Sequence, residues 1–102
     1  MNKYKEILKL ETLLKEGNVP YEIRPMLDGY QINIFNKEHT TYLCDAIEHF
    51  GSYGKDEDKL EIMGGLTSEE EEDNSVLGWL TAEEVFKRFK YCYENSTSTY
   101  KQ

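Results

Sequence analysis

The sequence predicts an α+β domain in which an N-terminal and a C-terminal helix pack on a small antiparallel sheet of two or three strands. Three patterns predict it: apolar residues at helical spacing near the start, apolar residues in alternation over residues 19–34, and an amphipathic stripe behind a helix cap near the end. A chain of 102 residues is the size of one domain with one core. We therefore expect a single domain over residues 1–95 and a frayed tail over residues 96–102.

An N-terminal helix is expected over residues 3–16. Its apolar stripe recurs at helical spacing and consists of Tyr4, Ile7, Leu8, Leu10, Leu13 and Leu14. Gly17 and Asn18 are residues that commonly end a helix, and Pro20 cannot continue one. The helix should therefore end before residue 18.

A β-hairpin is expected next. Apolar side chains alternate with polar ones at Val19, Tyr21, Ile23, Tyr30, Ile32 and Ile34. Between the two runs stands Asp28-Gly29, a strong hairpin-turn pair because glycine tolerates the positive φ that such turns require. Pro25 closes the first strand or makes it an edge strand, since proline cannot donate to a sheet ladder.

Residues 40–50, "TTYLCDAIEHF", fit two patterns. Thr40, Thr41 and Tyr42 favour a third strand, whereas the apolar residues at i, i+3, i+4 and i+7 from Leu43 form a helix face. A strand is preferred because a hairpin alone is only marginally stable. Residues 51–54 then form a loop, and residues 55–66 a short helix with acids in its first turn and glycines at its end.

The C-terminal helix has the clearest signals. Thr81 and Glu84 form a capping box, in which each side chain satisfies the backbone N–H of the other residue. The apolar stripe that follows runs to about residue 94 and consists of Val85, Phe86, Phe89, Cys92 and Tyr93.

The charge is acidic and uneven. The formal net charge is −8, and residues 56–102 carry five basic and twelve acidic side chains, which is −7 of that total. Such a surface is repelled by nucleic-acid phosphates and by anionic lipids, so direct binding to either is disfavoured. No apolar run approaches the length of a signal peptide or a membrane span. We therefore expect a cytoplasmic protein with reduced thiols and a protein partner that has a basic surface.

The motifs of metal and nucleotide sites are incomplete. Asp73, Ser75, Gly78 and Glu84 match parts of a calcium loop, but Leu77 offers no side-chain oxygen at the fifth position. "GSYGK" has no phosphate-loop continuation. We expect no metal and no cofactor.

A second candidate site is a zinc or thiol site, which could draw on His39, Cys44, Asp45 and His49. Their spacing is not one that recurs in zinc modules, and Cys44 is most simply a buried small residue. The neighbourhood of Cys44 and His49 is the candidate centre if the chain is an enzyme, but no orienting third group is identifiable. We predict no catalytic residue.

The strongest candidate for a binding surface is acidic. Its members are Asp56, Glu57, Asp58, Glu61, Glu69, Glu70, Glu71, Glu72, Asp73 and Trp79. The run Glu69–Asp73 is either a solvated connection or part of an interaction surface, because consecutive like charges repel one another and a plain connection does not need them. Trp79 is either a buried anchor of "SVLGWL" or an aromatic hot spot rimmed by carboxylates.

The segments "YEIRPMLDGYQINIF", "GSYGKDEDKLEIMGGL" and "SVLGWLTAEEVFKRF" resemble small acidic proteins of Firmicutes phages, prophages and mobile elements. The resemblance runs from about Val19 to Tyr93, and it implies a setting inside a bacterial host but no catalytic residues. Other small acidic phage proteins, including some anti-CRISPR proteins, inhibit host nucleases by imitating DNA. We therefore expect a protein-binding module, and the form of it that this analogy favours is a nucleic-acid mimic that inhibits a host DNA-handling or defence protein. The alternative is an accessory or structural protein that works through oligomerisation or Trp79.

Overall fold

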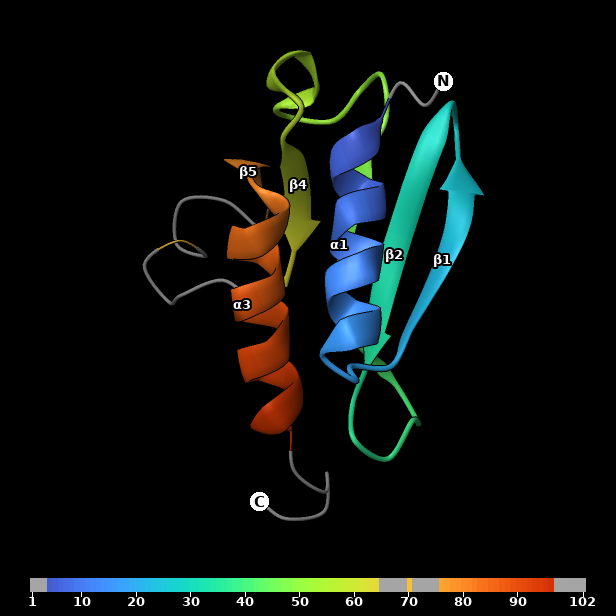
Figure 1. Cartoon of the computed structure of the whole chain (residues 1–102), viewed down its shortest axis with the longest axis vertical. Coiled ribbons are helices and arrows are strands. Elements are labelled where there is room, and N and C mark those ends of the chain that lie inside the picture. The colour runs from blue at the N-terminus through green and yellow to red at the C-terminus, as the bar shows by residue number, and fades with distance from the viewer. Residues whose placement is uncertain (1–3, 65–69, 71–75, 97–102) are drawn as a thin grey trace.

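A computed structural model of the chain describes residues 4–64, 70 and 76–96. In these residues, two helices lie on one face of a five-stranded antiparallel sheet (Figure 1). The elements in chain order are α1 (Lys5–Glu16), β1 (Tyr21–Met26), β2 (Gly29–Phe35), β3 (Tyr42–Glu48), the short 3-10 helix η1 (Lys55–Glu57), β4 (Leu60–Met63), β5 (Val76–Leu80) and α3 (Ala82–Glu94). The α+β class and both expected long helices are confirmed.

The strands form a meander, with the order β1-β2-β3-β4-β5 and each strand antiparallel to the next. The prediction of two or three strands was too low. The preferred strand over residues 40–50 is confirmed as β3, but the short helix over residues 55–66 was wrong. Its first three residues form η1, which stops where Asp58 takes a left-handed conformation at φ 57°, and β4 follows. Leu60 and Ile62 are buried on the helix-facing side of β4, so burial favoured a strand there.

The hairpin of β1 and β2 is confirmed, but its turn is shifted by one residue. Met26 pairs with Gly29, so the turn residues are Leu27 and Asp28, and Leu27 carries the positive φ of 54°. Gly29 is the first residue of β2 and serves a different purpose. A Cβ at this position would lie 1.8 Å from the carbonyl oxygen of Glu48 on β3, so only glycine allows the two strands to come this close.

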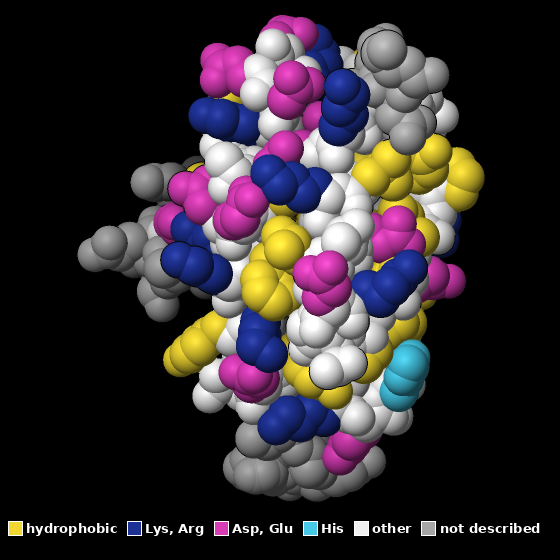
Figure 2. Space-filling model, viewed as in Figure 1, with side chains coloured by type: hydrophobic (Ala, Val, Ile, Leu, Met, Phe, Trp, Pro, Cys, Tyr) yellow, Lys and Arg dark blue, Asp and Glu magenta, His cyan; other side chains and the backbone are white. Residues whose placement is uncertain are grey.

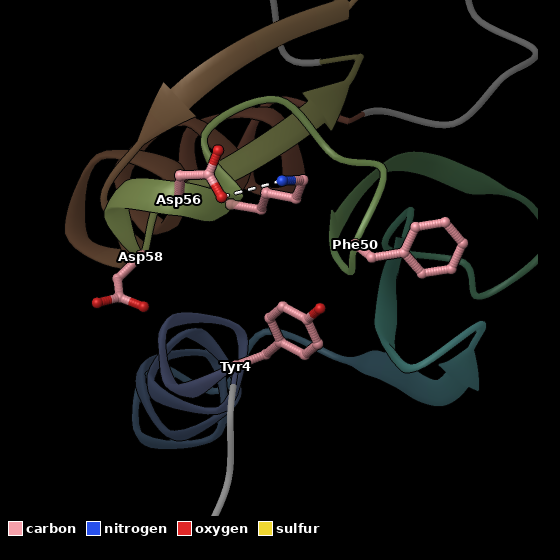
Figure 3. A pocket seen from close by; sticks show the side chains of 5 residues that line it. Tyr4, Phe50, Asp56 and Asp58 are labelled. Carbon is pink, nitrogen blue, oxygen red and sulfur yellow. Dashed lines mark hydrogen bonds and ion pairs between the residues drawn. The ribbon is translucent and has the colours of Figure 1, made fainter.

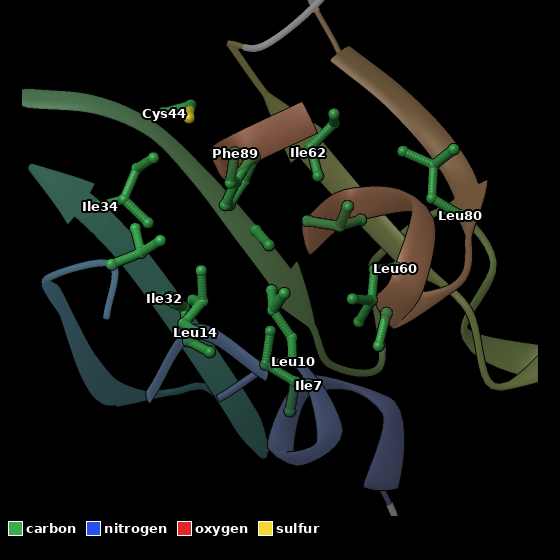
Figure 4. Packing of buried hydrophobic residues seen from close by; sticks show 14 of the residues in the cluster. Ile7, Leu10, Leu14, Ile32, Ile34, Cys44, Leu60, Ile62, Leu80 and Phe89 are labelled. Carbon is green, nitrogen blue, oxygen red and sulfur yellow. The ribbon is translucent and has the colours of Figure 1, made fainter. Parts of the chain in front are cut away.

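The core lies between the sheet and the two helices. Ile32 of β2 faces Ala46 of β3, which faces Ile62 of β4, and all three are buried. The helices contribute Ile7, Leu10, Leu14, Val85 and Phe89, each with no exposed surface. Ile32 and Ile34 are fully buried in this core, as a sheet packed by the two expected helices requires (Figure 4). Of the two phenylalanines in the C-terminal stripe, Phe89 fills the core and Phe86 lies at its edge.

Both long helices begin at the same end of the molecule, which is also where η1 lies (Figure 1). Their dipoles are therefore parallel, and each N-terminus concentrates partial positive charge there. Carboxylates from elsewhere in the fold satisfy the free amides. Glu48 of β3 accepts the Ile7 N–H at 2.9 Å, and Glu6 of α1 accepts the Ala82 N–H at 2.7 Å. The predicted capping box of Thr81 and Glu84 is present as well.

The face that the helices cover is mixed in charge. Figure 2 shows basic and acidic side chains interspersed over it, with no acidic field. Ion pairs such as Lys9–Glu83 and Lys90–Glu94, at 3.0 Å each, account for part of this pattern. The acidic side chains of the described residues are therefore not concentrated on this face.

Candidate functional site

Trp79 lies on β5 with its ring on the surface. The ring is 53% exposed and stacks on Tyr53, which is 50% exposed, with the ring centroids 5.6 Å apart and the planes 5° from parallel. Leu77 and Leu80 of the same strand pack against the core and anchor it. Trp79 is therefore not the buried anchor that was one of its two interpretations.

Two glycines allow the loop before η1 to lie against β5. A Cβ at Gly78 would come within 2.4 Å of the Tyr53 Cβ, and a Cβ at Gly54 would come within 3.0 Å of the Trp79 backbone. Gly54 also has a φ of 103°, which side chains disfavour. The Trp79 N–H donates to the Tyr53 carbonyl at 3.4 Å. The aromatic stack therefore depends on close backbone packing between two segments that are far apart in the sequence.

Carboxylates of η1 lie beside the aromatic stack. Asp56 and Glu57 have side-chain exposures of 87% and 61%, and they pair with Lys55 at 2.9 Å and with Lys59 at 3.9 Å. Ion pairs this exposed contribute little, because water and salt screen them. Both carboxylates can therefore exchange their lysine for another cation at little cost.

Two hollows meet at η1. The first has a volume of about 350 Å³ and is lined by Tyr4, Phe50, Lys55, Asp56 and Asp58. Figure 3 shows Tyr4, the N-cap of α1, and Asp56 of η1 on opposite sides of this hollow. Asp56 pairs there with Lys55. The hydroxyl of Tyr4 donates to Asp28 at 2.6 Å, and this bond together with burial raises the pKa of Tyr4 to about 12.

The second hollow has a volume of about 480 Å³ and is lined by residues 51–57 and Trp79. It shares Lys55 and Asp56 with the first. We call Tyr53, Asp56, Glu57 and Trp79 the acidic–aromatic surface. Tyr53, Phe50 and Tyr4 were not among the predicted site residues. The glycines on both sides of Tyr53 were the one signal for it, since they permit a tight loop that presents the ring between them.

Two other predicted acids are engaged within the fold. Glu61 accepts the Tyr53 N–H at 2.9 Å and so supports the loop under the aromatic stack. Glu70 accepts a hydrogen bond from each terminal nitrogen of Arg88, both at 2.9 Å. The remaining members of the predicted acidic run, Glu69 and residues 71–73, lie outside the described residues. The structure therefore brings Asp56, Glu57 and Trp79 together, places Asp58 at the neighbouring hollow, and gives Glu61 and Glu70 internal partners.

The residues of the suggested zinc or thiol site are dispersed. Cys44 is buried on the helix-facing side of β3, whereas Asp45 points to the other face and accepts from Gln31 at 2.7 Å. His49 is buried, and its Nδ1 accepts the Gly51 N–H at 3.0 Å. His39 packs on the ring of Phe35. Among the side chains that the structure describes, no three histidine, cysteine or acidic residues gather as a metal site would require.

The described part of the chain contains no helix that is both long and apolar enough to cross a membrane. Comparison with known proteins adds no relative, because no family model, no curated protein and no solved structure matches the chain.

Proposed function

We propose that the chain is a protein-binding module whose acidic–aromatic surface takes a basic segment of a partner protein. The observation that supports this best is the stacked pair of Trp79 and Tyr53, each ring half exposed, beside the exposed carboxylates of Asp56 and Glu57. Tryptophan and tyrosine are among the residue types that are enriched in interface hot spots. The exposed carboxylates beside this pair add a charge that attracts a basic partner.

A lysine or arginine side chain fits this surface chemically. Its cation can lie on the outer face of the Trp79 or Tyr53 ring, which is attractive by about 0.5–2 kcal/mol depending on desolvation. The same cation can replace Lys55 as the partner of Asp56, which lies beside the rings. The carboxylates would increase the association rate at low salt, and the aromatic contact would persist when salt screens the charges.

A narrower function within this proposal is nucleic-acid mimicry, in which the chain inhibits a DNA-handling or defence protein of a bacterial host. It is favoured by the charge of −7 over residues 56–102 and by the resemblance to small acidic phage and mobile-element proteins. The internal pairing of Glu61 and Glu70 reduces the acids that remain available for mimicry. In this proposal the protein acts in the host cytoplasm, without a catalytic residue or a cofactor.

The proposal is tested with the intrinsic fluorescence of Trp79, which is the single tryptophan of the chain. A lysine- and arginine-rich peptide is titrated into the protein at low and high salt, with an acidic peptide of equal length as the control ligand. We expect the basic peptide to change the Trp79 emission and the acidic peptide to leave it unchanged. The same titration by calorimetry extends the measurement to Trp79→Ala, for which the affinity should fall at least tenfold.

Two charge-matched variants separate a specific surface from general attraction. Asp56→Asn with Glu57→Gln removes two charges at the acidic–aromatic surface. Glu38→Gln with Glu94→Gln removes two charges from the β2–β3 loop and the end of α3, two segments that lie at the other end of the molecule from η1 (Figure 1). The first variant should lose affinity and salt dependence, and the second should bind almost as the natural chain does. Equal losses in both would contradict the proposal. If duplex DNA displaces the chain from a captured basic partner, the mimicry is supported; concentration-dependent self-association with no peptide binding would favour oligomerisation instead.

A further inference from the structure

The outer edge of β1 is an open edge of the sheet. β1 is the first strand in the sheet order, and among the described strands only β2 pairs with it. Figure 1 shows β1 as the outermost strand on its side of the molecule, with α1 nearer to β2 than to this edge. Such an edge is a template for another strand, because it presents a row of backbone N–H and C=O groups. A further strand can therefore join the sheet here.

The register of the hairpin decides which backbone groups of β1 face this edge. The Phe35 N–H of β2 donates to the Pro20 carbonyl at 3.4 Å, and in an antiparallel pair every second residue is bonded to its neighbour in this way. The even-numbered residues of β1 therefore bond to β2, and the odd-numbered ones point outward. Pro25 agrees with this phase, since a strand proline lies where its missing N–H faces away from the ladder. The edge offers the N–H groups of Tyr21 and Ile23 and the carbonyls of Tyr21, Ile23 and Pro25.

Two opposite charges stand on the face of β1 that the helices do not cover. Glu22 and Arg24 are both exposed, and they alternate with residues that pack against the core. Glu22 accepts the Tyr42 hydroxyl at Oε1, and the Arg24 Nε donates to Gln31 at 2.9 Å. The two terminal nitrogens of Arg24 have no carboxylate partner among the described residues. Each side chain is therefore positioned by a neighbouring strand and keeps atoms for a further ion pair.

A second copy of β1 is complementary to this edge in one register. When two chains pair antiparallel about a two-fold axis at Ile23, the two Ile23 residues exchange both N–H···O=C bonds. The Tyr21 N–H of each chain then donates to the Pro25 carbonyl of the other chain. Glu22 of each chain lies directly opposite Arg24 of the other, in a non-hydrogen-bonded pair whose side chains are close together. This register therefore satisfies the edge in both hydrogen bonding and charge.

The two neighbouring registers are unfavourable. A shift that pairs Tyr21 with Ile23 puts Glu22 opposite Glu22, and a shift that pairs Ile23 with Pro25 puts Arg24 opposite Arg24. Like charges directly opposite one another on a sheet are destabilising. The edge is therefore selective for a strand with its own sequence of charges.

We propose that the chain forms a two-fold dimer through β1, which joins the two five-stranded sheets into one continuous sheet. This interface lies at the opposite edge of the sheet from β5, so it does not include Trp79. It is separate from the acidic–aromatic surface and does not depend on the function proposed for that surface.

The first experiment measures the mass of the natural chain by sedimentation equilibrium over a series of concentrations. We expect the mass to rise from that of one chain to that of two and to stop there. Amide hydrogen exchange should show a protected Ile23 N–H where the dimer predominates, and dilution should remove this protection, because that N–H points away from β2. The mass of one chain at the highest soluble concentration, or a dimer whose Ile23 amide exchanges freely, would overturn the proposal.

Charge reversals test the register. Arg24→Glu and Glu22→Arg each turn two attractive pairs into two repulsive ones, so either variant alone should dimerise at least about tenfold more weakly. An equimolar mixture of the two variants again has opposite charges in both pairs, so a mixed dimer should form almost as tightly as the natural one. Glu94→Arg at the end of α3 is the control, since it changes the charge as much as Glu22→Arg does, and it should dimerise as the natural chain does.

Two results of the reversal experiment would refute this dimer. One is a homodimer of undiminished affinity in both single variants, and the other is a mixture that stays monomeric although circular dichroism shows both variants folded. A variant that is found unfolded is replaced by Arg24→Asp or Glu22→Lys, which bring the same charges.

Discussion

Carboxylates and aromatic rings occur in two regions of this molecule and have opposite roles in them. Inside, beneath the N-terminus of α1, Glu48 is fully buried, and Phe89 of α3 fills the core with no exposed surface. Outside, on the acidic–aromatic surface, Asp56 is 87% exposed and Trp79 is 53% exposed. Each region combines a carboxylate with an aromatic ring. Glu48 and Phe89 hold the helices on the sheet, whereas Asp56 and Trp79 are exposed to solvent.

Burial and hydrogen-bond or ion-pair partners determine the role of each acid in this fold. Tyr4 is the N-cap of α1 but makes no capping bond with its side chain, so Glu48 from β3 satisfies the Ile7 amide in its place. Asp56 instead pairs with its sequence neighbour Lys55 in solvent. One acid is therefore part of the tertiary structure, and the other can be removed without disturbing it.

The largest effect is expected at the interior ring. Phe89→Ala should lower the free energy of unfolding by about 3–5 kcal/mol, because it opens a cavity in the core. Trp79→Ala is the matched control on the surface, and it should cost only about 1 kcal/mol through the loss of the stack on Tyr53. Urea unfolding followed by far-ultraviolet circular dichroism measures both. Similar losses in the two variants would mean that β5 and its ring belong to the core.

The second effect concerns the interior acid. Glu48→Ala should lower the free energy of unfolding by about 2–3 kcal/mol, because it leaves a buried amide at the start of α1 without a partner. Glu57→Ala on the surface should leave that free energy unchanged. The same urea experiment applies, and amide hydrogen exchange should show the loss of protection beginning in the first turn of α1. A stable Glu48→Ala variant with full protection there would refute the capping role.

The smallest effect is a pH dependence. Burial raises the pKa of Glu48 above its ordinary 4.5, with the Ile7 N–H opposing, so the folded chain binds this proton more tightly than the unfolded chain. The resulting contribution to stability is complete below pH 4.5 and is lost as the pH rises through the folded pKa. Glu48→Gln keeps an oxygen for the Ile7 amide and cannot titrate.

The difference in unfolding free energy between the natural chain and Glu48→Gln should therefore shift in favour of the variant as the pH rises above 4.5. Urea unfolding at a series of pH values measures it. Asp56→Asn is the control, and its difference from the natural chain should not follow the same course. A constant difference for Glu48→Gln across this range would mean that Glu48 is equally hydrated in the folded and unfolded chains.

Local patterns in the sequence were sufficient for the elements that rest on local interactions. The stripe from Ile7 to Leu14, the alternation through Ile32 and Ile34, and the Thr81–Glu84 box each depend on residues within a few positions of one another, and each is present. A short strand leaves a weaker pattern. β4 has four residues and follows a charged segment, and β5 carries a glycine in its middle, so neither was predicted.

The sequence by itself determined the α+β class, the two long helices, the hairpin and the acidic character of the second half of the chain. The tertiary structure alone decided which acids have partners within the fold, because Glu48, Glu61 and Glu70 meet partners 41, 8 and 18 residues away. It also decided that Tyr53 stacks on Trp79, since this pair forms where separate segments pack together. Local propensity acts over a few residues, whereas these contacts exist only after the meander has formed and α3 has packed on it.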